Sequence, residues 1–317
     1  MMASAPKIDD SMNTRKKAFV LGDPIEHSLS PSLHQVAYEH LGYEIDYGRW
    51  KTSIEELPER FLPALTENVV GYSVTMPLKN AVIENLHELT DFAKVLDVVN
   101  TVYWRGEGSS RRAIGHNTDV SGIVNALHHA GVRVSTDDLP RAILGGGGTA
   151  TSALMALSFL GSTEVDLYVR SVERAATVLR LAEKLEIRLN ICRFEDFASQ
   201  YSVYEAVIST LPAGVADQFA PTLGSSLNGV LFDVSYDPWP STIASRWEDA
   251  GGVIVSGLDM LLYQAIDQIK LFTGHALEET LPEQLQMMNA MCSAIGLLPR
   301  NKLPLNVYSM EHFGSCG

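Results

Sequence analysis

Lys79 and Asp119 are the two side chains in this sequence whose types fit acid–base chemistry most directly. Lys79 ends the polar run 73–79, Asp119 ends the polar run 116–119, and each run lies where we expect a strand to end. An open α/β sheet binds its ligands at strand ends. A lysine beside such a cleft, oriented by a carboxylate, can exchange a proton with a bound hydroxyl or ketone.

Two further polar runs, 27–31 and 99–101, occupy equivalent places. Taken one at a time, these side chains fit ordinary structural roles: Ser30 would cap a helix, Thr75 would end a strand and Asn100 would form a turn. Taken together, the four runs supply hydroxyl, amide, ammonium and carboxylate groups. That set of groups would suit a small polyhydroxylated acid.

The glycine run 145–148, with Ala150 two positions on, fits the pattern G-x-G-x-x-A of a dinucleotide site. Such a loop makes a tight turn and lets the N–H groups of a helix start face a pyrophosphate. Alone, a four-glycine run would equally suit a flexible turn. Its position between an expected strand at 142–144 and an expected helix at 149–160 favours the dinucleotide.

The end of the next expected strand indicates which dinucleotide binds. NAD-binding folds carry an acidic residue there for the ribose 2′-hydroxyl. This sequence has Arg170 at that place and Arg174 one helical turn later, while Asp166 lies within the strand. Two guanidinium groups suit a 2′-phosphate, so we expect NADP. The alternative interpretation is a pair of solvated arginines at a helix start.

The order of expected elements places these groups in two α/β units. In the first, helices alternate with strands in a βαβαβ order that predicts a parallel sheet, with strands at 17–22, 45–50, 69–75 and 98–104. In the second, a helix at 119–130 leads into strands at 142–144, 165–169, 206–209, 230–234 and 253–256. Helices at 258–273 and 281–295 follow. The tail after Leu298 has no period, and we expect it to be loose.

The composition excludes several classes of protein. The chain has 317 residues and a formal net charge of −14, from 24 Lys+Arg against 38 Asp+Glu, which argues against binding nucleic acid or an anionic membrane. No apolar run has the length of a transmembrane helix, and residues 1–17 lack the apolar core of a signal peptide. Three dispersed cysteines indicate a cytoplasmic enzyme without structural disulfides. His27, His34 and His116 lack partners at metal-ligand spacing, so we expect no metal site.

Eight motifs occur in one order along residues 17–275: S-L-S-P…H, V-T-M-P-x-K, V-N-T, G-x-N-T-D, G-G-G-G, S-T-L-P-A-G, D-V-x-Y-x-P and G-L-x-M-L-x-x-Q-A. In this order they resemble the shikimate dehydrogenase family. The resemblance implies an α/β fold with an N-terminal substrate domain, completed by C-terminal helices, and a Rossmann-type NADP-binding domain. We expect residues 1–117 plus 258–317 to form the first domain and residues 118–257 the second.

The resemblance also implies a role for each residue that matches a motif. Lys79 would be the catalytic acid/base and Asp119 its partner. Ser28 and Ser30 would hold the carboxylate of the substrate. The other substrate contacts would be Thr75, Asn100, Tyr236 and Gln264. The cofactor contacts would be Asp91, Gly145, Gly146, Gly147, Gly148, Thr149, Arg170, Ser171, Arg174, Val234 and Gly257.

The implied reaction is the reversible, NADPH-dependent reduction of 3-dehydroshikimate to shikimate, on the route to aromatic amino acids. Ser73 and Val169 depart from the asparagines usual in the family, and the run 96–99 replaces an Ala/Gly-rich lead. These departures keep an NAD-preferring quinate/shikimate dehydrogenase as an alternative. A non-catalytic, ligand-sensing homologue would need a DNA-binding segment or a damaged Lys–Asp pair, and the sequence shows neither. A homodimer is compatible with the sequence but not indicated by it.

Overall fold

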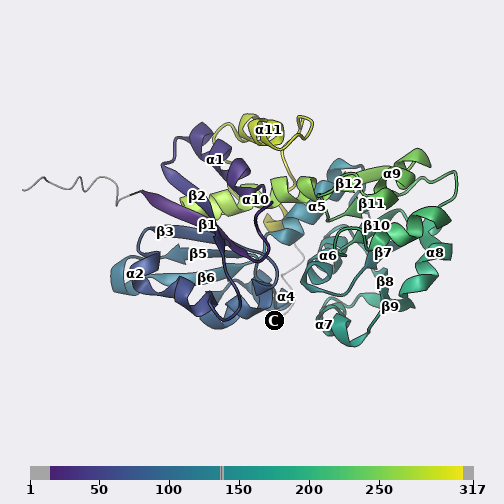
Figure 1. Cartoon of the computed structure of the whole chain (residues 1–317), viewed down its shortest axis with the longest axis horizontal. Coiled ribbons are helices and arrows are strands. Elements are labelled where there is room, and N and C mark those ends of the chain that lie inside the picture. Colours follow the sequence, from purple (N-terminus) through teal and green to yellow (C-terminus); the bar gives the residue numbers. More distant parts are fainter. Residues whose placement is uncertain (1–14, 136, 138, 310–317) are drawn as a thin grey trace, which may run out of the picture.

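The computed structural model describes residues 15–135, 137 and 139–309. It contains two six-stranded sheets that lie side by side, with helices packed around each of them (Figure 1). The N-terminal part of the chain builds the first sheet and the middle part builds the second. The fold is therefore α/β, as the sequence predicts.

The first sheet has the strand order β2-β1-β3-β5-β6-β4. Its strands are β1 (Lys16–Gly22), β2 (Ile45–Lys51), β3 (Val69–Val74), β4 (Glu88–Leu89), β5 (Thr101–Arg105) and β6 (Arg112–His116). β1 runs parallel to β2 and β3, as predicted. β5 runs antiparallel to both β3 and β6, so the sheet is mixed and the prediction of a parallel sheet was wrong for this half. The connection from Arg105 to Arg112 is too short for the crossover that a parallel pair requires.

The helices of this first part are mostly short. They are α1 (Ser30–Leu41), α2 (Pro63–Thr66), α3 (Leu78–Ala81) and α4 (Asp91–Leu96). α1 carries Pro31 in its first turn, where a proline costs no hydrogen bond, and it ends at Gly42 in the left-handed conformation with φ 74°. The buried side of α1 includes Leu33 and His34.

The second sheet has the order β12-β11-β10-β7-β8-β9, and every neighbouring pair in it is parallel. Its strands are β7 (Arg141–Leu144), β8 (Glu164–Val169), β9 (Arg188–Arg193), β10 (Ala206–Ser209), β11 (Val230–Asp233) and β12 (Val253–Ser256). Its helices are α6 (Gly148–Phe159), α7 (Ala176–Lys184), α8 (Phe197–Gln200) and α9 (Thr242–Asp249). The inner strands are buried because helices cover both faces. β9 is a partly exposed edge strand. The sequence did not predict it because polar residues interrupt its apolar pattern.

Two long helices connect the sheets. α5 (Asp119–His129) leads from β6 to β7, and α10 (Gly257–Thr273) leads from β12 back over the first sheet (Figure 1). They pack against each other, and α11 (Gln284–Ala294) then packs on α1. Residues that follow the second sheet thus complete the first one. The domain limits expected from the sequence remain a prediction.

Residues 299–309 are packed, which contradicts the expectation of a loose tail for this part of it, while residues 310–317 lie outside the described residues. The Arg300 guanidinium pairs with Asp259 at the start of α10, and the Leu305 N–H donates to Asn125 Oδ1 on α5 at 2.6 Å. Tyr308 donates to Asp267 Oδ2 on α10 at 3.0 Å. Val307 is buried in the hydrophobic core, and Leu305 and Tyr308 pack against it. These few contacts do not repeat at helix or strand spacing, so no hydrophobic period reveals the segment in the sequence.

Within residues 15–309, apart from 136 and 138, no helix is both long and apolar enough to cross a membrane. Cys192 and Cys292 are free thiols. Cys316, the third cysteine considered in the sequence, lies outside the described residues.

Candidate active site

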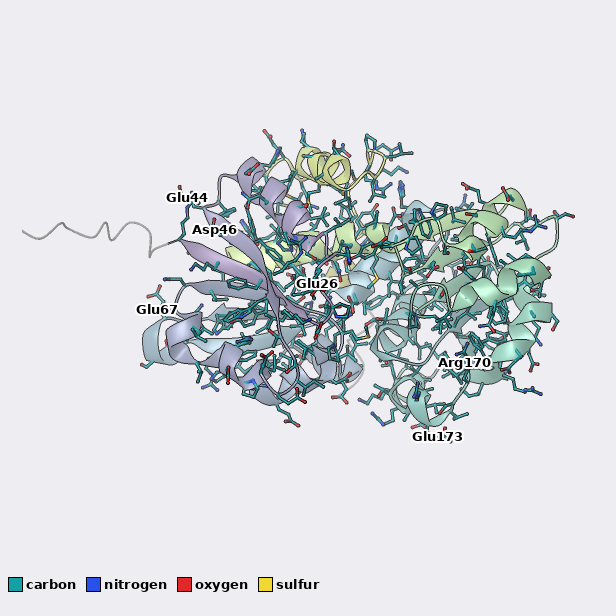
Figure 2. All side chains as sticks on the ribbon, viewed as in Figure 1. Glu26, Glu44, Asp46, Glu67, Arg170 and Glu173 are labelled. Atoms are coloured by element: carbon teal, nitrogen blue, oxygen red, sulfur yellow. The ribbon has the colours of Figure 1, made fainter. Side chains whose placement is uncertain are left out.

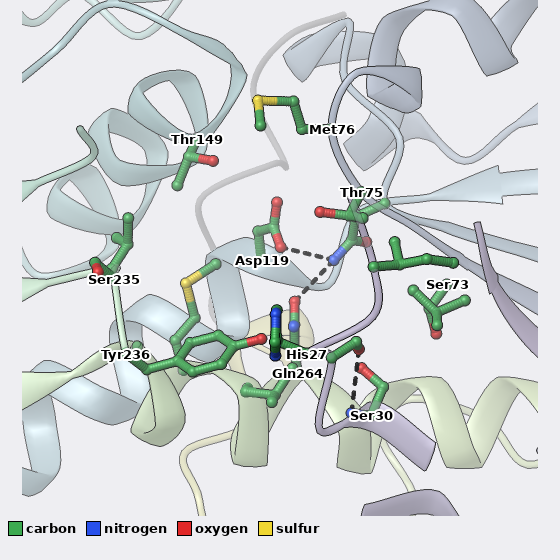
Figure 3. A pocket seen from close by; sticks show the side chains of 18 of the residues that line it. His27, Ser30, Ser73, Thr75, Met76, Asp119, Thr149, Ser235, Tyr236 and Gln264 are labelled. Atoms are coloured by element: carbon green, nitrogen blue, oxygen red, sulfur yellow. Dashed lines mark hydrogen bonds between the residues drawn. The ribbon is translucent and has the colours of Figure 1, made fainter. Parts of the chain in front are cut away.

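A cavity of about 500 Å³ opens between the two sheets, at the ends of β1 and β3 on one side and of β10 and β11 on the other. All eight residues predicted to be catalytic or to bind substrate line it: Ser28, Ser30, Thr75, Lys79, Asn100, Asp119, Tyr236 and Gln264. Figure 3 shows that Tyr236 reaches from the side of the second sheet across the cavity toward His27. The structure therefore brings together motifs that are more than 200 positions apart.

The Lys79 Nζ and Asp119 Oδ2 atoms lie 2.5 Å apart in this cavity, with side chains 17% and 2% exposed. Lys79 is the second residue of the short helix α3, while Asp119 occupies the first turn of α5. The positive end of a helix favours a carboxylate in that turn. The Asp119 N–H also donates to Asn117 Oδ1 at 3.0 Å, which fixes the entry into the helix.

Asn100 holds the second oxygen of Asp119. Its own side-chain oxygen accepts from the Thr118 N–H and from the Thr101 hydroxyl, both at 2.8 Å. The side-chain NH₂ must therefore point the other way, where it donates to Asp119 Oδ1 at 2.8 Å and to Gln264 Oε1 at 3.0 Å. The carboxylate is thus oriented by an amide on one oxygen and an ammonium on the other.

Gln268 is a site residue that the sequence reasoning missed. It lines the cavity one helical turn after Gln264, with 3% of its surface exposed. Its Oε1 accepts from Ser73 Oγ at 2.7 Å, and its NH₂ donates to Thr101 Oγ1 at 3.0 Å. The i, i+4 spacing of the two glutamines on one helix was the available signal.

His34 is a fully buried histidine that contacts Gln268. Its Nε2 lies 3.3 Å from Gln268 Oε1, its Nδ1 lies 3.0 Å from the Tyr38 hydroxyl, and its ring stacks on Tyr47. Burial lowers the pKa of His34 to about 3, so the ring is neutral at ordinary pH. Because Gln268 Oε1 can only accept, Nε2 carries the proton.

Ser73 stands where the shikimate dehydrogenase family, which the sequence resembles, usually has an asparagine. A tyrosine supplies a hydrogen bond to this shorter side chain. The Tyr47 hydroxyl donates to Ser73 Oγ at 2.6 Å, and Ser73 Oγ donates onward to Gln268. The shorter side chain is therefore fully hydrogen-bonded. The chain of donors leads from Tyr47 through Gln268 to the Asn100 region of the site.

A second cavity of about 240 Å³ lies at the end of β8 and is lined by Gly145, Gly146, Arg170, Ser171, Arg174 and Phe194, among others. Gly145 has φ +104°, and a Cβ there would lie 2.6 Å from Thr210 Oγ1, so this position requires glycine. A Cβ on Gly147 would meet nothing within 4 Å, and α6 begins at the next residue without a side-chain cap. Open space before free helix N–H groups fits the pyrophosphate of a dinucleotide.

The two predicted arginines are exposed at this second cavity. The Arg170 guanidinium lies 4.6 Å from the centre of the Phe194 ring, and neither Arg170 nor Arg174 forms a salt bridge within the described residues. Glu173 lies between them in the sequence, and Ser171 Oγ donates to its carboxylate at 2.5 Å. Figure 2 shows Arg170 and Glu173 on the part of the molecule that carries the second sheet.

The remaining predicted cofactor residues fall in different places. Thr149, Val234 and Gly257 line the first cavity. Asp91 begins α4 with a side chain that is 91% exposed, and it pairs with Lys94 at 2.8 Å. Asp91 lines neither of the two cavities. Among the residues that the structure describes, no group of three or more His, Cys, Asp or Glu side chains could hold a metal ion.

An all-parallel sheet with a glycine loop at the start of its first crossover helix defines a Rossmann-type dinucleotide-binding fold, here joined to a mixed sheet across a cavity that contains the Lys79–Asp119 pair. A family model described as the shikimate dehydrogenase substrate binding domain matches residues 20–102. The NADP(+)-dependent shikimate dehydrogenase of Bacillus cereus is 30% identical over 262 residues, which cover 80% of this chain and 91% of that protein. This chain belongs to the shikimate dehydrogenase family, a family of oxidoreductases.

Solved structures agree with this assignment. Shikimate dehydrogenase from Mycobacterium tuberculosis has 35% identity and a TM-score of 0.76, covering 89% of this chain and 99% of that one. The enzyme from Thermus thermophilus, solved with NADP(H) and shikimate, has 30% identity and a TM-score of 0.71, covering 88% and 99%. The chain also aligns with the pentafunctional AROM polypeptide of Komagataella phaffii at 29% identity, over 17% of the length of that longer protein.

Proposed function

We propose that this protein catalyses the reversible, NADP-dependent reduction of 3-dehydroshikimate to shikimate. The observation that carries the proposal is the Lys79–Asp119 contact, placed in a cavity that all eight predicted catalytic and substrate residues line. The similarity to an enzyme solved with NADP(H) and shikimate supports the same ligands here.

The chemistry divides between the cofactor and the chain. A nicotinamide cofactor, when bound, supplies the hydride that reduces a ring ketone to an alcohol. The Lys79 ammonium donates a proton to the ketone oxygen as negative charge develops on it, and solvent at this partly exposed lysine restores the proton. Asp119 keeps the ammonium in place and accepts a hydrogen bond from a ring hydroxyl.

Substrate orientation follows from the polar groups around this pair. Ser28 and Ser30, at the start of α1, bind the substrate carboxylate through their hydroxyls. Thr75, Asn100 and Gln264 contact ring hydroxyls. Tyr236, which extends from the opposite side of the cavity (Figure 3), would cover the ring of the bound substrate.

The cofactor preference rests on the end of β8. Arg170 and Arg174 offer two guanidinium groups without carboxylate partners to a 2′-phosphate, which favours NADP. One observation favours the alternative, NAD: Glu173 does not line this cavity, but its carboxylate accepts a hydrogen bond from Ser171, which does, and a carboxylate so close would repel a phosphate and could accept a ribose hydroxyl. We favour NADP because the two positive charges of Arg170 and Arg174 outweigh the single negative charge of Glu173.

The test is a panel of initial rates on the purified full-length chain. Shikimate and quinate are each combined with NADP⁺ and NAD⁺, and formation of the reduced nicotinamide is followed by absorbance. The proposal expects shikimate with NADP⁺ to have the highest kcat/KM of the four pairs. A higher kcat/KM for quinate with NAD⁺ would instead establish the alternative dehydrogenase.

A further inference from the structure

The charged side chains that line the large cavity are unfavourable for an acidic substrate. Three of them are carboxylates, Glu26, Asp119 and Asp237, and Lys79 is already paired with Asp119. Lys51, which pairs with the lining residue Glu26 at 3.6 Å, is also paired with Asp23 at 2.9 Å. The end of the cavity that holds Ser28 and Ser30 therefore presents neutral hydroxyls among negative charges, in a chain of net charge −14.

Arg49 on β2 is the cation adjacent to this end. Its Nη2 donates to the carbonyl oxygen of Ser28 at 2.5 Å, so the guanidinium lies directly against the loop that leads into α1. No carboxylate among the described residues forms a salt bridge with Arg49. Its charge is thus available to a ligand rather than neutralised by the protein.

The charge of Arg49 also acts on two tyrosine hydroxyls, those of the half-buried Tyr236 and the buried Tyr47. Burial raises the pKa of Tyr236, and the Arg49 charge opposes that rise, while Asp237 adds to it. Burial likewise raises the pKa of Tyr47, with its hydrogen bonds to Ser73 and Ser30 and the charge of Arg49 acting in the opposite direction. Tyr236 lines the cavity, and the partners of Tyr47, Ser30 and Ser73, line it as well, so the charge of Arg49 acts at the Ser28–Ser30 end.

We propose that Arg49 is a specificity-determining residue that supplies the positive charge for the substrate carboxylate at the Ser28–Ser30 end of the cavity. The inference rests on the proposed function and goes further, since it states why an acid is selected over an uncharged ring of the same shape. Arg49 acts by its charge and by holding the Ser28 carbonyl, and it takes no part in proton or hydride transfer.

Two substitutions separate charge from structure. Arg49→Gln removes the charge but keeps an N–H donor for the Ser28 carbonyl, and Arg49→Lys keeps the charge. Arg112→Gln, an exposed arginine on β6 outside the cavity lining, is the matched control. Each variant is compared with the wild type on shikimate and on its uncharged methyl ester, by steady-state kinetics with NADP⁺ and by calorimetric titration of binding.

For Arg49→Gln we expect KM and Kd for shikimate to rise about tenfold, with kcat within about threefold of wild type. The methyl ester should show no more than about a twofold change, and Arg49→Lys should recover most of the affinity for shikimate. An equal loss on acid and ester, or no loss on either, would overturn the inference while wild-type turnover of shikimate still upheld the proposed function. A wild type that neither binds nor oxidises shikimate would overturn the proposed function and this inference together.

Discussion

Asn100 and Asp119 meet through one hydrogen bond of 2.8 Å, and the direction of that bond is set by the backbone on the far side of Asn100. Because the Thr118 N–H occupies the amide oxygen of Asn100, only the NH₂ group can face Asp119. Asp119 is therefore an acceptor on both oxygens, toward Asn100 and toward Lys79. A carboxylate held in this way orients the Lys79 ammonium before any substrate binds.

Replacing Gln268 by leucine should weaken the fold as well as the site. The substitution leaves Ser73 and Thr101 without their buried partner, and we expect the free energy of unfolding to fall by about 1–3 kcal/mol. Urea denaturation followed by circular dichroism measures this loss. Gln218→Leu, at an exposed glutamine, is the control and should change stability little. Equal stability of the two variants would show that the Gln268 hydrogen bonds contribute nothing net.

The pH dependence of stability should report two buried histidines. Burial lowers the pKa of both His34 and His116 from 6.5 to about 3. The unfolded chain takes up these protons near pH 6.5 while the folded chain does not. Stability is therefore complete above pH 6.5 and is lost as the pH falls from 6.5 toward 3, by up to about 1.4 kcal/mol per pH unit for each histidine.

Denaturation midpoints measured from neutral to mildly acidic pH test this slope. His34→Gln and His116→Asn should each reduce the dependence on pH by the contribution of one histidine. Using both variants guards against a single substitution that disturbs packing. If both variants keep the wild-type slope, these two side chains are not the groups that take up protons on unfolding.

The arginines at the end of β8 should determine the affinity for the 2′-phosphate. In a variant that combines Arg170→Gln with Arg174→Gln, we expect KM for NADP⁺ to rise at least about tenfold and KM for NAD⁺ to change little. Arg180→Gln, further along the chain in α7, provides the control. A similar rise in KM for both cofactors would indicate that the arginines support the structure of the site and do not bind the 2′-phosphate.

Glu173 should have the opposite effect on the same preference. Glu173→Gln removes the negative charge that Ser171 contacts, so the ratio of kcat/KM for NADP⁺ over NAD⁺ should rise by about threefold. The change should diminish at high salt because the carboxylate is exposed. If the ratio of kcat/KM for NADP⁺ over NAD⁺ is unchanged at low salt, the charge of Glu173 does not affect how the ribose end of the cofactor binds.

The sequence predicted the parts of this protein that depend on motifs at strand ends. Lys79, Asp119 and the glycine loop could be found because each follows an apolar strand at a turn. Tyr47 could not, since it lies within a strand and only the tertiary packing makes it a neighbour of Ser73. Gln268 was missed although its i, i+4 spacing from Gln264 was a signal, and only the packing shows that it contacts Ser73. The antiparallel pairing of β5 and β6 follows from the short connection between them. Hydrophobic periodicity predicts strands but not their direction, so it did not predict this pairing.

Lys79→Met in a pre-steady-state reaction tests the central claim most directly. The variant and the wild type are each saturated with shikimate and NADP⁺, and reduced nicotinamide is followed by absorbance; Lys94→Met, at an exposed lysine, is the control. We predict that Lys79→Met binds shikimate but forms the reduced cofactor at least about a hundredfold more slowly, while Lys94→Met matches the wild type. A rate for Lys79→Met within about tenfold of the wild type would contradict the proposed acid–base role.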